Sequence, residues 1–257
     1  MRLRVMTFNL RYDNEADGGN RWQDRRDTAA AAVREVGAHV VCTQEGLAHM
    51  LSYLQDVLPE YSMVGRGRDA DGGGEHSAIF FRPDRFEATA VETFWFSTEP
   101  GVPGSRSWGA VLPRICTWCR LVSRETGETV RVYNVHLDNR SEEARRRSVE
   151  MLVAHVAGAD EPTIVCGDFN AEPLTVEMRL LCSQAAARGG RGLLGCTSLS
   201  RGTFHGFTGT PANAGPIDYI LSTPDLSVSG RNVLDRRFDG RWPSDHFPVW
   251  ADVTVPG

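Results

Sequence analysis

Polar and ionisable residues stand at the ends of several apolar, strand-like runs of the sequence. They are Asn9, Glu45, His136, Asp168, Asn170, Asp218, Asp245 and His246. Carboxylate and amide oxygens suit Mg²⁺, which prefers oxygen ligands. Two imidazoles, each held by a carboxylate, can bind phosphate oxygens, and a further carboxylate can orient an attacking water. Together these residue types favour metal-dependent hydrolysis of a phosphoester.

Residues 167–170, Gly-Asp-Phe-Asn, form the centre of this set. Residues 163–166 are apolar and rich in β-branched side chains, which predicts a buried strand that ends here. Side chains alternate along a strand, so we expect Asp168 and Asn170 to point the same way and Phe169 to point into the core. The same four residues also favour an ordinary turn, and alone they support both interpretations about equally.

Each of the other polar residues has a simple structural interpretation as a cap, a satisfied turn or a hydrogen-bonded core histidine. For any single residue that interpretation is favoured. For the whole set it is weaker, because it leaves many carboxylates without partners at one rim. No nucleophile elbow, phosphate-binding glycine loop or dinucleotide fingerprint offers a competing site.

The elements that must position these residues are mostly strands. Strands are predicted at residues 3–10, 38–42, 75–81, 86–96, 114–122, 129–137, 163–166, 216–221, 226–234 and 247–253. Helices are predicted at residues 22–36, 47–58, 142–156 and 175–187, and residues 188–203 are expected to be irregular. This order predicts an α/β protein with two mostly antiparallel sheets packed back to back and helices outside. No linker or repeat divides the chain, so residues 1–257 are expected to form one domain.

The charge of the chain limits the partners it can have. The formal net charge is −5, and all 28 basic residues are arginine. Such a balance disfavours a protein that coats long nucleic acid, although a local basic patch remains compatible with it. The first residues already read as a strand, and no apolar run is long enough to cross a membrane. We therefore expect a cytoplasmic monomer without a membrane partner.

The six cysteines do not suggest a disulfide framework in a chain of this length. Cys116 and Cys119 have the spacing of half a zinc site, but no matching pair follows. They also lie on a strand pattern, where side chains three residues apart face opposite ways. Buried free thiols are the favoured interpretation.

Six motifs in order resemble those of the endonuclease/exonuclease/phosphatase (DNase I-like) superfamily, including its small bacterial branch. They are the segments at residues 7–10 (TFNL), 43–45 (TQE), 134–137 (NVHL), 167–170 (GDFN), 217–220 (IDYI) and 244–249 (SDHFPV). Residues 202–207 (GTFHGF) and 113–118 (PRICTW) are similar to segments of small bacterial members. The resemblance implies a four-layer fold, in which helices flank a two-sheet sandwich.

The resemblance also implies roles for individual residues. Glu45 is the main metal carboxylate, with Asn9 beside it and Asp245 as a further ligand, and the metal is Mg²⁺, for which Mn²⁺ can substitute. Asp168 orients or deprotonates the water, and Asn170 holds a phosphate oxygen. His246, paired with Asp218, and His136 bind the scissile phosphate from two sides. Glu75 is implied to pair with His136, and Arg114 to contact substrate phosphate.

Three hypotheses about function remain open at this point. The favoured one is hydrolysis of a small or nucleotide-like phosphomonoester or phosphodiester. The second is a nuclease that acts on DNA or RNA, and the third is a non-catalytic binding protein on the same fold. Trp108, in the loop before Arg114, could stack on a base, but a place at the core edge is favoured. The loops expected nearest the site, residues 69–75 and 211–216, carry almost no positive charge, which predicts a shallow rim suited to one phosphate.

Overall fold

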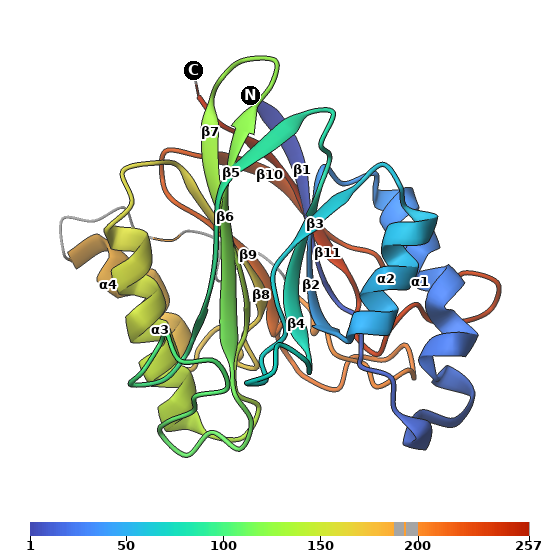
Figure 1. Ribbon diagram of the computed structural model, residues 1–257. Coiled ribbons are helices and arrows are strands. Elements are labelled where there is room, and N and C mark those ends of the chain that lie inside the picture. The colour runs from blue at the N-terminus through green and yellow to red at the C-terminus, as the bar shows by residue number, and fades with distance from the viewer. Residues whose placement is uncertain (188–192, 194–199, 257) are drawn as a thin grey trace.

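The computed structural model describes residues 1–187, 193 and 200–256. Over these residues the chain forms two β-sheets that face each other, with helices on both outer faces (Figure 1). The strand order in the first sheet is β10-β11-β1-β2-β4-β3, and in the second it is β5-β6-β7-β8-β9. This is the helix-flanked two-sheet sandwich of the α/β class that the sequence predicts.

The first sheet contains one parallel pair among its described strands, and the other pairs are antiparallel. Its strands are β1 (Arg2–Asn9), β2 (Val40–Gly46), β3 (Ser62–Val64), β4 (His76–Phe81), β10 (Ser227–Val233) and β11 (Val249–Thr254). The parallel pair is β1 with β2, which helix α1 (Trp22–Val36) connects. The sequence did not predict the short edge strand β3.

The second sheet repeats this plan over the described residues. Its strands are β5 (Phe86–Trp95), β6 (Ile115–Ser123), β7 (Thr129–His136), β8 (Thr163–Asp168) and β9 (Asp218–Ser222). Strands β7 and β8 are parallel and are joined by helix α3 (Glu142–Ala157), while the other neighbours are antiparallel. A parallel pair needs such a crossover connection, and a helix is its usual form.

Helices cover the outer face of each sheet. Figure 1 shows α1 and α2 (Ala48–Val57) beside the first sheet, and α3 and α4 (Val176–Ala187) beside the second. A 3₁₀ helix, η1 (Glu15–Asn20), precedes α1. Helix α3 begins as predicted, because the Ser141 hydroxyl accepts a hydrogen bond from the Ala144 N–H. Among the described helices, none has the length and apolar character that a membrane crossing requires.

Alternation along the strands builds the core in layers. On β1, Leu3 and Val5 face the second sheet, whereas Met6 and Phe8 face the helices α1 and α2. On β8, Ile164 and Cys166 face the first sheet, and Val165 packs against α3 and α4. Burial of such side chains is the main stabilising contribution to the fold, at roughly 25 cal/mol per Å² of apolar surface.

The structure corrects some details of the sequence prediction. Strand β2 extends past residue 42 and therefore includes Glu45. In α1, Arg25 is buried among the apolar side chains. The predicted irregular segment at residues 188–203 lies mostly outside the described residues.

The cysteines follow the prediction only in part. Cys42, Cys116, Cys119 and Cys166 are buried free thiols. Burial raises the pKa of the Cys116 and Cys119 thiols, which keeps them protonated and unsuited to zinc. Cys182 on α4, by contrast, is disulfide-bonded, and the sequence did not indicate this bond.

Candidate active site at the strand ends

Strand directions bring the polar residues of the sequence to one edge of the sandwich. Asn9, Glu45, His136 and Asp168 lie at or near the C-terminal ends of β1, β2, β7 and β8. Strands β4, β6, β9 and β11 run antiparallel to these neighbours, so their N-terminal ends reach the same edge. At or near these ends lie five further predicted residues, namely Glu75, Arg114, Asp218, Asp245 and His246.

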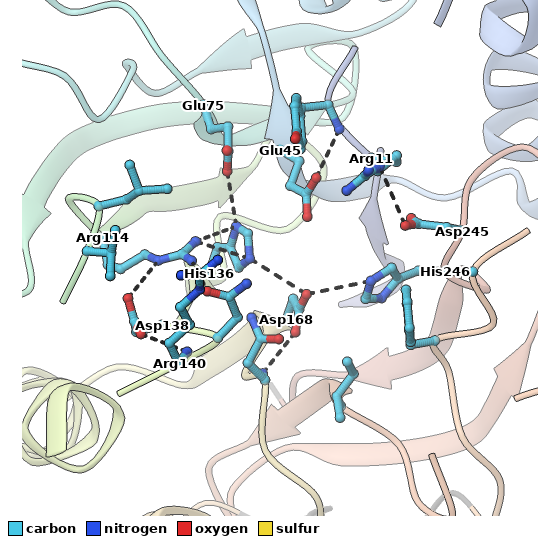
Figure 2. Close-up of a pocket in the computed structure, with 18 of the residues that line it drawn as sticks. Arg11, Glu45, Glu75, Arg114, His136, Asp138, Arg140, Asp168, Asp245 and His246 are labelled. Carbon is cyan, nitrogen blue, oxygen red and sulfur yellow. Dashed lines mark hydrogen bonds and ion pairs between the residues drawn. The ribbon is translucent and has the colours of Figure 1, made fainter. Parts of the chain in front are cut away.

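A cleft of about 980 Å³ opens at this edge, and most of the predicted residues line it (Figure 2). The predicted residues in its wall are Glu45, Glu75, Arg114, His136, Asp168, Asn170, Asp245 and His246. Asn9 and Asp218 are fully buried just behind the wall, where they bond to residues that line it. The predicted site is therefore assembled in space.

The register of the second sheet sets the centre of the cleft. Asp168 is opposite His136 on β7 and opposite Asp218 on β9. Gly167 makes this close pairing possible, because a Cβ atom there would lie 2.1 Å from the Val135 carbonyl oxygen. The φ of Gly167 is also positive, at 147°. A side chain at position 167 would therefore separate Asp168 from His136.

Asp168 lies between the two imidazoles. Its Oδ2 is 3.7 Å from Nε2 of His136 and 3.9 Å from Nε2 of His246. Figure 2 shows the two rings on opposite sides of this carboxylate. Its Oδ1 accepts a hydrogen bond from the Asn170 N–H at 2.9 Å, and Asn170 has a φ of 49°. Residues 167–170 therefore form both a turn and part of the cleft, and Phe169 points into the core as expected.

His246 is held by a carboxylate behind it. Its Nδ1 is 2.9 Å from Oδ2 of Asp218, and both side chains are buried. Burial lowers the pKa of His246, but the negative charges of Asp218 and Asp168 outweigh it. The pKa is therefore raised well above its usual value of 6.5. A protonated His246 directs Nε2 toward the cleft as a hydrogen-bond donor.

His136 is surrounded by charged partners. Its Nδ1 lies 3.5 Å from Oε2 of Glu75, which also accepts a hydrogen bond from Arg68 at 2.7 Å. Burial raises the pKa of Glu75, but His136, Arg68 and Arg114 outweigh this and lower it to about 2. The Arg114 Nη1 is 3.3 Å from the His136 ring nitrogens. A permanently charged Glu75 therefore orients His136, while Arg114 adds positive charge beside it.

Glu45 reaches the cleft from a strained position at the end of β2. Its φ is 60°, a conformation that non-glycine residues seldom adopt and that is typical of functional sites. Its Oε2 accepts a hydrogen bond from the Tyr12 N–H at 2.9 Å, and its Oε1 accepts one from Nδ2 of Asn9 at 3.0 Å. Asp168 Oδ2 accepts the second Nδ2 hydrogen of Asn9 at 2.9 Å.

The amide of Asn9 is oriented differently from what the resemblance implies. Its Oδ1 accepts a hydrogen bond from the Arg11 N–H at 2.9 Å, so the oxygen points away from Glu45 and Asp168. Asn9 thus bridges the two carboxylates through its nitrogen. In this arrangement it positions possible ligands and does not present an oxygen for a metal.

The carboxylates and the imidazole that converge in the cleft could hold a hard divalent cation. Ligand atoms of Glu45, His136 and Asp168 lie within 4.8 Å of one another. Asp245 lines the same cleft, and burial together with the negative charge of Glu45 raises its pKa. The carboxylates of Glu45, Asp168 and Asp245 all line the cleft, and they repel one another unless a cation lies between them. Oxygen donors of this kind suit Mg²⁺ or Mn²⁺.

The cleft contains more positive charge than the sequence predicts. Arg11, Arg68, Arg114 and Arg140 all line it, although the loops at residues 69–75 and 211–216 carry little charge. Three of these four arginines, all except Arg114, were not among the residues predicted from the sequence. Arg11 and Arg140 follow the first and third motifs by only a few residues, so extending those motifs could have identified them.

Other differences concern residues around the cleft. Trp108 does not line it, and its carbonyl instead accepts a hydrogen bond from Ser141 at the start of α3. Tyr12, Val111, Leu112, Phe204 and Phe207 line the cleft but were not predicted. Arg145, on helix α3 near the cleft, forms an ion pair with Glu177 at 2.6 Å.

The chain matches one protein-family model, described as the Endonuclease/Exonuclease/phosphatase family, over residues 6–246. An endonuclease/exonuclease/phosphatase family protein from Bacteroides thetaiotaomicron has 31% sequence identity and a TM-score of 0.92, covering 100% of this chain and 96% of that chain. A mannosyl-6-phosphatase from Bacteroides thetaiotaomicron VPI-5482 has 32% identity and a TM-score of 0.90, covering 98% and 100%.

More distant structures share the fold. TDP2 from D. rerio, complexed with a single strand DNA product, has 17% identity and a TM-score of 0.76, and the match covers 99% of each chain. At this identity the similarity concerns the fold alone. No curated protein matches the chain.

Proposed function

Since the chain belongs to the endonuclease/exonuclease/phosphatase family, we propose that it is a divalent-metal-dependent hydrolase of small phosphoesters. The observation that carries this proposal is the position of Asp168 between two imidazoles, next to Glu45, in an open polar cleft. This arrangement offers a base for water and positive groups for phosphate within one small space.

The proposed reaction assigns each residue one task. The water oxygen attacks phosphorus while its proton passes to Asp168. The bond from phosphorus to the leaving oxygen breaks, and the leaving oxygen takes a proton from water in the open cleft. His246 and His136 donate hydrogen bonds to the phosphate oxygens from opposite sides. Asn170 and Arg114 are proposed to hold the remaining phosphate oxygens, which fixes the phosphate for in-line attack.

The proposed metal residues are Glu45 and Asp245, with Asn9 holding Glu45 in position. When bound, Mg²⁺ or Mn²⁺ supplies positive charge that stabilises negative charge on the phosphate oxygens. Glu75 keeps His136 oriented, and Asp218 does the same for His246. These tasks rest on the ion pair of His136 with Glu75 and on the hydrogen bond between His246 and Asp218.

A small phosphomonoester is the favoured substrate class. The mannosyl-6-phosphatase, at 32% identity over nearly the full length of both chains, supports a sugar phosphate as the first compound to test. The cleft, of about 980 Å³, has room for a phosphate that carries a sugar or a nucleoside. The net charge of −5 and the carboxylates that pair with most cleft arginines disfavour a long nucleic acid backbone.

The experiment that tests this proposal is a substrate panel measured at physiological salt with Mg²⁺. The panel contains sugar 6-phosphates, mononucleotides, bis-(p-nitrophenyl) phosphate, short single strands and plasmid duplex. We expect the highest kcat/KM for a small phosphoester. A nuclease is favoured instead if plasmid or single strands exceed every small compound, and a binding protein if no compound is hydrolysed.

A further inference from the structure

The segment at residues 202–207 contains a buried hydroxyl close to the cleft, that of Thr203. Its Oγ1 accepts hydrogen bonds from the backbone N–H groups of Ile217 and Asp218, at 3.0 and 3.2 Å. It also lies 2.5 Å from Oδ2 of Asp218. Thr203 has no exposed surface, so water does not compete for these bonds.

The direction of the hydrogen bond between Thr203 and Asp218 follows from the number of donors and acceptors that the hydroxyl offers. A hydroxyl has one hydrogen and two lone pairs. Both lone pairs of Thr203 are used by the two N–H groups, so its hydrogen must point to Asp218. Thr203 therefore donates to this carboxylate and cannot rotate to another partner without leaving a buried N–H unpaired.

The oxygen that Thr203 bonds is the one that holds His246. Oδ2 of Asp218 also lies 2.9 Å from Nδ1 of His246, whereas Oδ1 has no hydrogen-bond partner among the described residues. Two donors on one oxygen, together with the bond to the Asp218 N–H, fix the rotation of the carboxylate. That rotation decides where the His246 ring lies, because Nδ1 follows Oδ2.

The same segment also holds the backbone beside His246. The Thr203 carbonyl accepts a hydrogen bond from the Phe247 N–H at 2.8 Å. Phe204 pairs with His246 across an isolated bridge, and its ring centroid lies 5.0 Å from that of the imidazole. Thr203 thus contacts both the carboxylate and the chain that carries the histidine.

We propose that Thr203 is a positioning residue, which acts through Asp218 to aim Nε2 of His246 into the cleft. This role rests on the proposed function, in which His246 binds the phosphate. If it is correct, removal of the hydroxyl misplaces the imidazole and lowers the rate of the chemical step. Substrate binding through Asn170, His136 and Arg114 is left almost unchanged.

The test compares Thr203→Val, which is nearly isosteric but lacks the hydroxyl, with Thr203→Ser, which retains it. Thr223→Val is the matched control, because the Thr223 hydroxyl is equally buried and bonds both the N–H and the carbonyl of Thr163. The first readout is the low-field ¹H resonance of the His246 Nδ1–H at pH 7. The second is kcat and KM on a small phosphoester.

For Thr203→Val we expect the resonance to shift or broaden and kcat to fall about tenfold, with KM within about twofold of wild type. Thr203→Ser and Thr223→Val should keep the wild-type resonance and kcat, even where Thr223→Val lowers Tm. If Thr203→Val does not fold, Thr203→Cys, which is a weaker donor, should give an intermediate shift of the resonance.

A Thr203→Val protein with an unchanged resonance and wild-type kcat would overturn the proposal. An equal loss of kcat in Thr223→Val would also overturn it, because the effect would then be general destabilisation. The resonance is read without substrate, so it separates the two proposals. If the resonance shifts in Thr203→Val but the wild type hydrolyses no phosphoester, the positioning role is supported and the proposed function is rejected.

Discussion

The side-chain nitrogen of Asn9 lies 2.9 Å from Oδ2 of Asp168, although the two residues belong to different sheets. The other hydrogen of this nitrogen goes to Glu45. One buried amide therefore joins the proposed base, the proposed metal carboxylate and the two halves of the sandwich. The geometry of the cleft depends on how the sheets are stacked.

Replacing Asn9 with alanine should affect activity more than a comparable change elsewhere between the sheets. Without the amide, Glu45 and Asp168 lose a shared donor and repel each other, so we expect kcat to fall by roughly 10²-fold. Asn134→Ala is the control, since Asn134 also bridges the sheets, through Thr43 and Ala78. It should cost about 1–3 kcal/mol of stability with a smaller loss of kcat. Equal losses of kcat in both variants would mean that Asn9 has only a structural role.

The two cleft histidines are expected to act on the same phosphate. His136→Ala and His246→Ala should each lower kcat by roughly 10²-fold or more, and Asp218→Asn should lower it through His246. His49→Ala, on the exposed face of α2, should have wild-type rates. Steady-state kinetics on the best panel substrate provides the measurement. If His246→Ala is as active as the wild type, residues 244–246 form only a structural turn and His246 does not act on the phosphate.

Replacing Asp168 and replacing Asn170 should have different effects on kcat and on substrate affinity. Asp168→Asn keeps the shape but removes the base, so kcat should fall with little change in substrate affinity. Asn170→Ala removes a proposed phosphate contact and a hydrogen bond to the Leu137 carbonyl, so both kcat and affinity should fall. Inhibition by inorganic phosphate measures the affinity separately. If Asp168→Asn has wild-type kcat, residues 167–170 form only a structural turn and Asp168 is not the base.

Stability should depend on pH through His205, which is buried against Phe247. Burial, together with the charge of His246, lowers the pKa of His205 to about 4, against 6.5 in the unfolded chain. The unfolded state then binds a proton first as the pH falls. Stability from this group is complete above pH 6.5 and is lost as the pH falls toward 4, by at most about 3 kcal/mol.

Chemical denaturation at several pH values measures this effect. His205→Asn retains an acceptor for the Gly209 N–H and removes the titrating group, so its unfolding free energy should change less between pH 6.5 and 4 than that of the wild type. His49→Gln should keep the wild-type dependence. The same slope in His205→Asn and wild type would show that His205 does not contribute.

The sequence predicted the architecture because hydrophobic alternation and polar strand ends are local patterns. The order of strands places Glu45, His136, Asp168 and His246 at one edge once their directions are known. The sequence could not give the register that sets Asp168 opposite both His136 and Asp218. Nor could it give the direction of the Asn9 amide, since both depend on contacts between distant segments.

The cleft arginines illustrate the same limit. Arg11 enters the cleft wall from a left-handed turn, and Arg68 enters by pairing with Glu75. The position of Arg68 does not follow from its neighbours in sequence, whereas Arg11 directly follows the first motif. Trp108 shows the converse. The sequence allowed stacking on a base, although a place at the core edge was favoured, and the residue lies outside the cleft.

Glu45 is proposed to support metal-dependent hydrolysis, and turnover measured with and without metal is the decisive experiment. We predict that EDTA abolishes hydrolysis of the best small phosphoester, that Mg²⁺ or Mn²⁺ restores it, and that the metal raises Tm of the wild type. Glu45→Gln should lose the turnover and the rise in Tm while remaining folded, whereas Glu15→Gln, at an exposed position, should keep both. Full activity in EDTA, or a Glu45→Gln enzyme as active as the wild type, would contradict the account.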